Sequence, residues 1–302
     1  MSRRGAWLLG VGIVAVLLLA VGIGIGLWRS SSSPATAEDT ATAYLRALES
    51  RDANGLDSTG PDISDEARAA FSGATGYITD GAVGDVDQRG DTATVDVSFQ
   101  LDGETRSATL TLTLTDGGWR IDSSGLGTLT VVPDTGAFVS VGDAVVAADD
   151  GIPLLPARYP LLAAPDDLVD GTASVAVLPG EYVDADLDVE LRDAATGAAQ
   201  AALDEHLETC TAKGGEQPDG CGIRIPWGTE FREVSDVSYR IETLPSLVLS
   251  GTGFTAGGGV LVATITGTGQ DGAARTTTYR TESWMVRGDV RFSETAIALT
   301  VW

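Results

Sequence analysis

The chain has few residues that could carry out acid–base or redox chemistry. Its 302 residues include one histidine and two cysteines, and Lys213 is the only lysine. Aromatic residues make up 6% of the sequence, and no GxSxG, SxxK, HExxH or Walker sequence occurs in it. A chain with so few titratable bases is poorly equipped for general acid–base catalysis. We therefore expect a protein that is not an enzyme and that carries no cofactor or metal.

Basic residues are also scarce. The sequence holds 19 lysines and arginines against 43 aspartates and glutamates, for a formal net charge of -24. Residues 1–30 contain three arginines and no acid, so every acidic side chain lies after them. A surface of this sign repels the phosphate backbone. The composition excludes nucleic acid as a partner.

One long apolar run, at 6–28, stands out against this acidic background. Trp7 to Trp28 is 22 residues, about 33 Å as a helix, which matches a hydrocarbon core of about 30 Å. Aromatic and basic anchors for the membrane interface flank the run: Trp7, Trp28, Arg3, Arg4 and Arg29. The pattern predicts a single-pass protein of the cell membrane, with a cytoplasmic N-terminus and extracytoplasmic C-terminal domains.

Two further interpretations apply to the same segment. A cleaved signal peptide would need a shorter apolar run of about 7–15 residues, and the small residues at 35–37 lie far beyond the end of this one. Gly22 and Gly26 lie four residues apart on one helix face, a spacing that would allow two copies to pack closely. A homodimer through these glycines is one partner arrangement that the spacing allows.

The next region, 38–123, follows a short polar linker at 30–37 and predicts helices followed by an antiparallel sheet. Apolar residues recur at helical spacing from Ala41 to Leu48, and a second short helix is expected over 64–71. The period then changes to two on either side of a tight turn at 102–103. The alternating apolar positions are Val95, Val97, Phe99 and Leu101 before the turn, and Ala108, Leu110, Leu112 and Leu114 after it.

Three segments of this region carry a family resemblance. ATAYLRALESRDANGL, GDTATVDVSFQLDG and LTLTLTDGGWRID resemble the NTF2-like (cystatin-like) extracytoplasmic domains of bacterial envelope proteins. A membrane helix followed by such domains is also similar to Mce-associated proteins and to the teicoplanin-resistance-associated membrane protein of Gram-positive bacteria. The resemblance implies a helix-plus-sheet cone, a fold that hosts enzymes, ligand binders and interaction modules alike. The catalytic Asp/His pairs of the enzymatic members have no equivalent, because 38–123 contains no histidine.

The remaining sequence divides into two regions. Short apolar segments with proline and glycine between them predict a small all-β module at 124–194. In 195–302 we expect a disulfide-containing α+β domain with a helix over 195–212, for which a second NTF2-like unit is one interpretation. Its strands are expected near 234–242, 246–252, 259–267, 275–286 and 289–302. The predicted fold class is therefore α+β, with the N-terminal transmembrane helix and cytoplasmic tip occupying 1–29.

Cys210 and Cys221 are the two cysteines, and a disulfide is their expected state in an oxidising compartment. His206 lies four residues before Cys210 on the same predicted helix face. A Cys–His nucleophile pair would need the thiolate that a disulfide removes. Two cysteines with one nearby histidine also make a poor zinc site by sequence criteria.

Acidic residues alternate with apolar ones over 184–190, at Asp184, Asp186, Asp188 and Glu190. On a strand these carboxylates would face one way, and a Ca²⁺ site is one interpretation. The glycine and glutamate positions of an EF-hand loop are occupied by Val189 and Ala195. We interpret the segment as a solvated strand face.

These observations predict a membrane-anchored extracytoplasmic cell-envelope protein that acts as a non-enzymatic interaction or scaffold module, with an envelope protein as partner. Two alternatives remain open. One is a receptor that binds a small apolar or cell-wall-derived ligand in an NTF2-like cone, which a pocket with a few converging polar groups would favour. The other is a hydrolase that uses carboxylates alone, which would need two carboxyl groups about 5–9.5 Å apart across a cleft.

Overall fold

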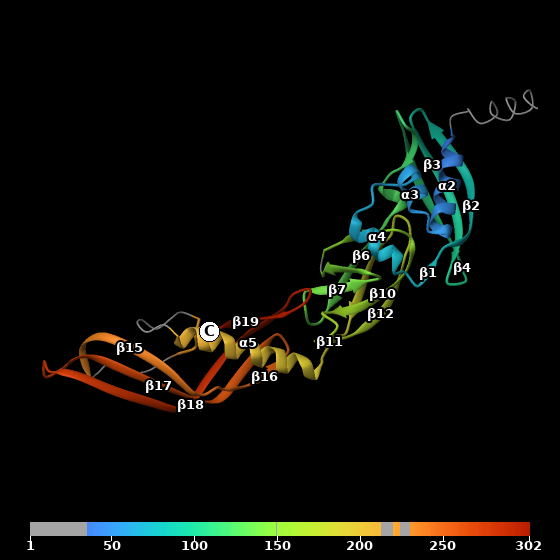
Figure 1. Cartoon of the computed structure of the whole chain (residues 1–302). Coiled ribbons are helices and arrows are strands. Elements are labelled where there is room, and N and C mark those ends of the chain that lie inside the picture. Colours follow the sequence, from blue (N-terminus) through green and yellow to red (C-terminus); the bar gives the residue numbers. More distant parts are fainter. Residues whose placement is uncertain (1–34, 149, 213–219, 224–229) are drawn as a thin grey trace, which may run out of the picture.

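A computed structural model of the chain describes residues 35–148, 150–212, 220–223 and 230–302. Three groups of strands follow one another along an elongated molecule (Figure 1). The N-terminal group carries helices α2 to α4, the middle group consists of short strands, and the C-terminal group carries the long helix α5. The buried apolar residues of all three groups form one continuous core cluster.

Helix α2 (Ala37–Ser50) begins at a capping box, because Thr36 and Asp39 bond reciprocally to each other's backbone N–H groups. It is followed by α3 (Ala53–Thr59) and α4 (Asp65–Ser72). The helices accompany a four-stranded antiparallel sheet in the order β2-β3-β4-β5. Its strands are β2 (Thr79–Arg89), β3 (Thr92–Leu101), β4 (Glu104–Thr115) and β5 (Gly118–Ile121).

The alternating apolar side chains predicted for β3 and β4 pack one face of this sheet against the core. The predicted apolar positions of β3 are all buried, and Leu110 and Leu112 of β4 face the same core, whereas Leu114 is 41% exposed. Tyr44 of α2 is fully buried beneath the sheet and donates its hydroxyl to the Gly125 carbonyl over 2.8 Å. Burial raises the pKa of the Tyr44 hydroxyl well above its ordinary value.

The middle group contains three small sheets. The largest has the order β1-β10-β7-β8, with β12 also paired to β10, and a second has the order β13-β6-β9 with β6 and β13 parallel. The third pairs β11 with β14. The strands are β1 (Gly76–Tyr77), β6 (Gly127–Pro133), β7 (Phe138–Val141), β8 (Ala144–Ala147), β9 (Ile152–Leu154), β10 (Ala157–Ala164), β11 (Val169–Asp170), β12 (Thr172–Val177), β13 (Tyr182–Leu187) and β14 (Glu190–Leu191), and η1 (Ser123–Gly125) precedes β6.

The C-terminal group is a five-stranded antiparallel sheet in the order β15-β17-β18-β19, with β16 also paired to β17. Helix α5 (Asp193–Thr211) packs beside it, with four buried apolar side chains along one face: Ala195, Ala199, Leu203 and Leu207. The strands are β15 (Phe231–Thr243), β16 (Ser246–Ser250), β17 (Gly253–Gly269), β18 (Ala274–Phe292) and β19 (Ile297–Val301). The expected strand break between 286 and 289 is wrong, because β18 runs through it with Gly288 close against the Thr300 carbonyl of β19.

The predicted fold class needs correction. The structure is mostly β, with 55% strand and 20% helix, and it contains four α-helices in its described part. The predicted α+β fold class is therefore wrong. The helix content is low because the C-terminal sheet, with its long strands, packs against a single helix, α5. Most of the residues of this region are therefore in strands.

The prediction of a single-pass membrane protein is also corrected. The apolar run at 6–28, with its flanking anchors and the Gly22/Gly26 pair, lies outside the described residues. Over the residues that are described, none of the helices is long and apolar enough to cross a bilayer. Even α5, with 19 residues, carries acidic side chains at both ends.

Candidate functional site

A cavity of about 280 Å³ lies where the N-terminal helices meet the middle group of strands. It is less open to solvent than two larger hollows on the described part of the chain. The lining residues come from the end of α2, from α3, α4 and β1, and from the connection between β9 and β10. They are Arg51, Ala53, Leu56, Arg68, Phe71, Ser72, Tyr77 and Leu155. We refer to this cavity as the arginine pocket.

The apolar wall of the arginine pocket is held in one conformation by its own contacts. Phe71 of α4 is buried and meets the Tyr77 ring edge to face, with centroids 5.1 Å apart and an interplanar angle of 87°. The Tyr77 hydroxyl donates to the Phe71 carbonyl over 2.8 Å, which fixes the second ring against the helix end. Leu56 and Leu155, both almost fully buried, complete the wall.

Arg51 supplies the first positive charge of the pocket. It ends α2 in the left-handed conformation, with φ 58° and ψ 35°, and its N–H bonds the carbonyls of Ala47 and Leu48. Glycine is the usual residue at such a helix end. The Arg51 guanidinium carbon lies 3.8 Å from the centroid of the Tyr77 ring. Among the residues that the structure describes, no carboxylate forms an ion pair with it.

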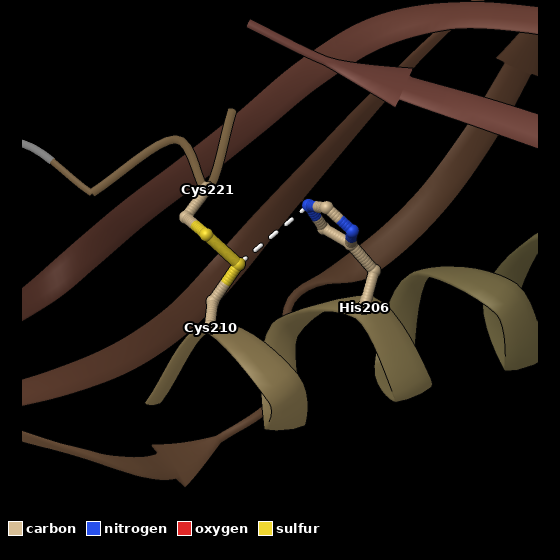
Figure 2. A group of neighbouring side chains, drawn as sticks. All are labelled: His206, Cys210 and Cys221. Carbon is tan, nitrogen blue, oxygen red and sulfur yellow. Dashed lines mark hydrogen bonds between the residues drawn. A yellow bond between two sulfur atoms is a disulfide. The ribbon is translucent and has the colours of Figure 1, made fainter. Parts of the chain in front are cut away.

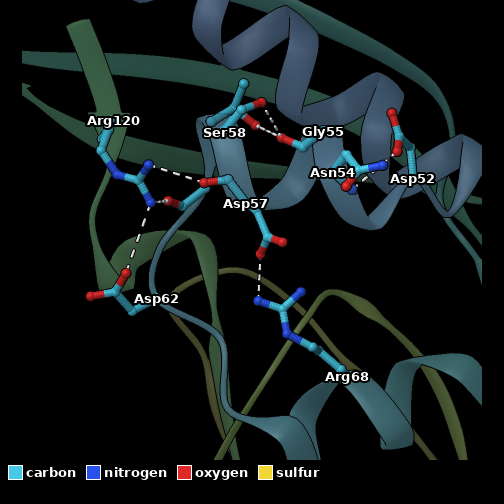
Figure 3. A network of polar contacts seen from close by, with 10 residues as sticks. Asp52, Asn54, Gly55, Asp57, Ser58, Asp62, Arg68 and Arg120 are labelled. Atoms are coloured by element: carbon cyan, nitrogen blue, oxygen red, sulfur yellow. Dashed lines mark hydrogen bonds and ion pairs between the residues drawn. The ribbon is translucent and has the colours of Figure 1, made fainter. Parts of the chain in front are cut away.

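Arg68 supplies the second charge and belongs to a polar network that fixes α3 (Figure 3). Its guanidinium, on α4, pairs with the Asp57 carboxylate on α3. From the other side, Arg120 of β5 donates to the carbonyls of Asp57 and Gly60, each over 3.0 Å, and lies 3.9 Å from a carboxylate oxygen of Asp62. Helix α3 is thereby held between α4 and the sheet edge, and Leu56 stays turned into the pocket wall.

The arrangement combines two guanidinium groups with an aromatic and aliphatic wall. Arg68 is already neutralised by Asp57, whereas Arg51 is held over an aromatic face without an acid beside it. The pocket therefore keeps one positive charge, that of Arg51, to offer to a ligand. A pocket of this kind offers charge-assisted hydrogen bonds to an anion and apolar contacts to the body attached to it.

Two larger hollows are less suited to holding a ligand. One, of about 430 Å³, lies over the outer face of β3 and β4, where Thr109 already donates to the Asp96 carboxylate over 2.7 Å. The other, of about 520 Å³, lies between the start of β7 and the end of β18, beside Asp289 and Arg291. Asp289 there also accepts from the Trp302 indole over 3.3 Å. Both hollows are more open to solvent than the arginine pocket.

The cysteines named by sequence analysis form the Cys210–Cys221 disulfide, with Cα atoms 5.8 Å apart (Figure 2). Both cysteines are buried. The Nε2 atom of His206 lies 3.6 Å from the Cys210 sulfur and 2.8 Å from the Gly220 carbonyl oxygen. These three side chains are the one group in the described residues whose potential metal-ligating atoms all lie within 4.8 Å of one another. The oxidised sulfurs are bonded to each other and offer no thiolate.

The structure separates the four acidic residues that could have formed a Ca²⁺ site. Asp184 and Asp186 are exposed on β13, which runs parallel to β6 and ends at Leu187. Asp188 follows the strand, and Glu190 begins β14 opposite Asp170. A solvated strand face is the arrangement seen for the first two residues.

Sequence reasoning did not identify the residues of the arginine pocket. Arg51 follows a helix end, Arg68 lies within a short helix and Tyr77 belongs to a two-residue strand, so no spacing connects them. One property of the sequence could have indicated them. Basic residues are scarce, so each arginine next to an apolar segment is a candidate for binding an anionic ligand.

Comparison with known proteins found no matching family model, no matching curated protein and no matching solved structure. The resemblance to NTF2-like domains receives no support from these comparisons.

Proposed function

We propose that this chain is a non-enzymatic binding protein for a small anion that carries an apolar or aromatic part. The arginine pocket would take the ligand. The observation that carries the proposal is Arg51, whose exposed guanidinium borders a partly open, mainly apolar cavity and has no carboxylate paired with it among the described residues. A bound carboxylate would complete its hydrogen bonding, while Phe71, Tyr77 and Leu155 contact the body of the ligand.

The size of the cavity limits the ligand. Its volume of about 280 Å³ is close to the lower end of the range for small-molecule sites, about 300–1,000 Å³. Hydrogen bonds to charged groups contribute about 1.5–3 kcal/mol, and burial of apolar surface adds about 25 cal/mol per Å². A small aromatic carboxylate fits these limits, whereas a long-chain lipid exceeds them.

The test uses the purified full chain and a set of small aromatic and aliphatic carboxylates, with benzoate first and neutral benzamide as its uncharged counterpart. Isothermal titration calorimetry should detect saturable binding of benzoate and much weaker binding of benzamide. Arg51→Gln should weaken benzoate binding about 10- to 150-fold, the factor that corresponds to about 1.5–3 kcal/mol.

Arg46→Gln is the matched control, because Arg46 is an exposed arginine of α2 that does not line the pocket. It makes the same change in charge and should leave the affinity unaltered. The proposal fails if no carboxylate of the set binds, if benzamide binds as well as benzoate, or if Arg51→Gln and Arg46→Gln have equal effects.

The two other functions considered from the sequence stay predictions. An interaction or scaffold role would be tested by crosslinking the chain to its neighbours in the intact cell envelope. A carboxylate-dependent hydrolase would need a facing pair of carboxyl groups, and the lining of the arginine pocket contains no acidic residue.

A further inference from the structure

The disulfide region holds a second constellation, independent of the arginine pocket. His206 and Cys210 lie one turn apart on the same face of α5, and Cys221 approaches them from the segment that returns to the helix (Figure 2). Their ligating atoms, one imidazole nitrogen and two sulfurs, lie within 4.8 Å of one another. Nitrogen and thiolate sulfur are the ligands that Zn²⁺ prefers.

The returning segment is held in place by contacts other than the disulfide. The Trp284 indole of β18 donates to the Gly222 carbonyl over 3.3 Å, and Ile223 is 1% exposed. Gly222 has φ 61°, and a side chain there would press on Val286 and Val301. Cys221 is therefore kept beside α5 by packing on the sheet, so breaking the disulfide leaves the two cysteines and the histidine close together.

The spacing between His206 and Cys210 matches a zinc tetrahedron. With Zn–N of about 2.0–2.1 Å and Zn–S of about 2.3 Å, the edge that joins the nitrogen to a sulfur is about 3.6 Å. The Nε2–Sγ distance in the structure is 3.6 Å. The edge between two thiolates would be about 3.8 Å, which the sulfurs can reach by side-chain rotation once they are no longer bonded to each other.

We propose that reduction of the Cys210–Cys221 disulfide creates a Zn²⁺ site formed by both thiolates and Nε2 of His206, with water in the fourth position. A dithiol reductant transfers two electrons and two protons to the disulfide, which yields two cysteine thiols and a cyclic disulfide of the reductant. Binding of Zn²⁺ then releases the two thiol protons. His206 gives up its contact with the Gly220 carbonyl and carries its proton on Nδ1, which frees Nε2 for the metal.

The consequence is an exchange of one cross-link for another. In the oxidised chain a covalent bond ties the segment at 220–223 to α5, and in the reduced chain the metal ties the same two elements. The C-terminal sheet would keep its connection to α5 under both redox conditions. The choice between covalent bond and metal then reports the redox state and the zinc supply around the protein.

The test compares oxidised and reduced full chain. A water-soluble phosphine reduces the disulfide, forming its phosphine oxide from water, and is removed before ZnCl₂ is added. Elemental analysis after gel filtration should find one zinc per reduced chain and none above background in the oxidised chain. Cobalt in place of zinc should give a thiolate-to-metal charge-transfer band, which reports sulfur ligation directly.

Three variants locate the site. Cys210→Ala with Cys221→Ala should abolish binding, and His206→Ala should weaken zinc binding by the reduced chain at least tenfold. Thr209→Ala is the matched control, since Thr209 is exposed on α5, its hydroxyl donates to the Glu205 carbonyl, and it is not one of the three potential ligands. It should leave zinc affinity unchanged.

Zinc bound equally by the oxidised chain or by the double cysteine variant would overturn the proposal and would place the metal on the acidic surface. A reduced chain that remains folded by circular dichroism and binds no zinc would overturn it as well. If reduction unfolds the C-terminal sheet, added zinc should restore the circular dichroism signal of the native chain but not that of His206→Ala. Failure of zinc to do so would equally count against the site.

Discussion

Gly142 is the position where one methyl group should have the clearest effect on both stability and the arginine pocket. It lies in the turn between β7 and β8 with φ 57°, and its N–H bonds the Pro160 carbonyl. A Cβ atom there would lie 2.2 Å from the Ala70 carbonyl oxygen of α4. Gly142→Ala must therefore move the turn or the helix whose next residue, Phe71, forms the pocket wall.

A second variant separates the two contributions to the loss of stability, which are backbone strain and the close contact with α4. Gly90, in the turn between β2 and β3, has φ 66°, and a Cβ atom there would have nothing within 4 Å, so Gly90→Ala introduces backbone strain alone. Alanine in the left-handed region costs about 1–2 kcal/mol, and the lower entropy of the unfolded chain returns about 0.4–1 kcal/mol of this. Gly142→Ala adds an overpacking cost of about 1–3 kcal/mol.

Urea unfolding followed by tryptophan fluorescence and circular dichroism measures both variants at pH 7. We expect Gly142→Ala to lose about 2–4 kcal/mol in total and Gly90→Ala to lose at most about 1.5 kcal/mol. Benzoate affinity should fall in Gly142→Ala and stay unchanged in Gly90→Ala. Equal losses of stability in the two variants would refute the close approach of α4 to the turn.

Two further predictions concern the core and the cross-link. Burial raises the pKa of Tyr44, so the folded chain keeps this hydroxyl neutral at a pH where the unfolded chain ionises it. The free energy of unfolding is therefore unaffected by Tyr44 ionisation below the ordinary tyrosine pKa of about 10. Above that value it falls by at most about 1.4 kcal/mol per pH unit. Tyr44→Phe loses the hydrogen bond to Gly125 and should be about 1 kcal/mol less stable than the native chain in urea titrations at pH 8. At pH 11 the difference in stability between the two chains should be smaller. An unchanged difference would contradict the raised pKa of Tyr44. Replacing Cys210 and Cys221 together by alanine removes a cross-link that spans 11 residues and should lower the free energy of unfolding by about 3 kcal/mol in the same assay. If the native chain loses the same free energy of unfolding when it is treated with reductant, the disulfide is the cause of the loss. No loss of stability in the variant or in the reduced native chain would contradict a stabilising disulfide.

Local patterns predicted much of the secondary structure. The turn at Asp102 and Gly103 is formed with positive φ at both residues, and β3 and β4 pair across it from Leu101 and Glu104 onward. The helix expected over 195–212 appears as α5. These elements are visible in a single sequence because their periodicity follows from one face meeting the core.

Strand β2 shows where periodicity fails. Its eleven residues, TDGAVGDVDQR, are nearly all exposed, and register shifts interrupt its pairing with β3. An edge strand that buries neither face has no apolar alternation, so nothing in the sequence marks it as a strand. The long β18 was expected as two strands, at 275–286 and 289–302. Gly288 lies inside the observed strand, where its lack of a side chain permits the close approach of β19.

The sequence alone determined the acidic charge, the scarcity of catalytic side chains and the pairing of its two cysteines, since composition and a short loop leave few alternatives. Tertiary structure decided which side chains from distant parts of the sequence lie next to one another. It turned Arg51 and Arg68 toward a cavity closed by Leu155, more than 80 positions further along the chain. It also placed Cys221 beside His206 and Cys210, so that the potential ligating atoms of the three side chains lie within 4.8 Å of one another. Distances between residues remote in sequence depend on how sheets and helices pack, and that packing is a property of the whole fold.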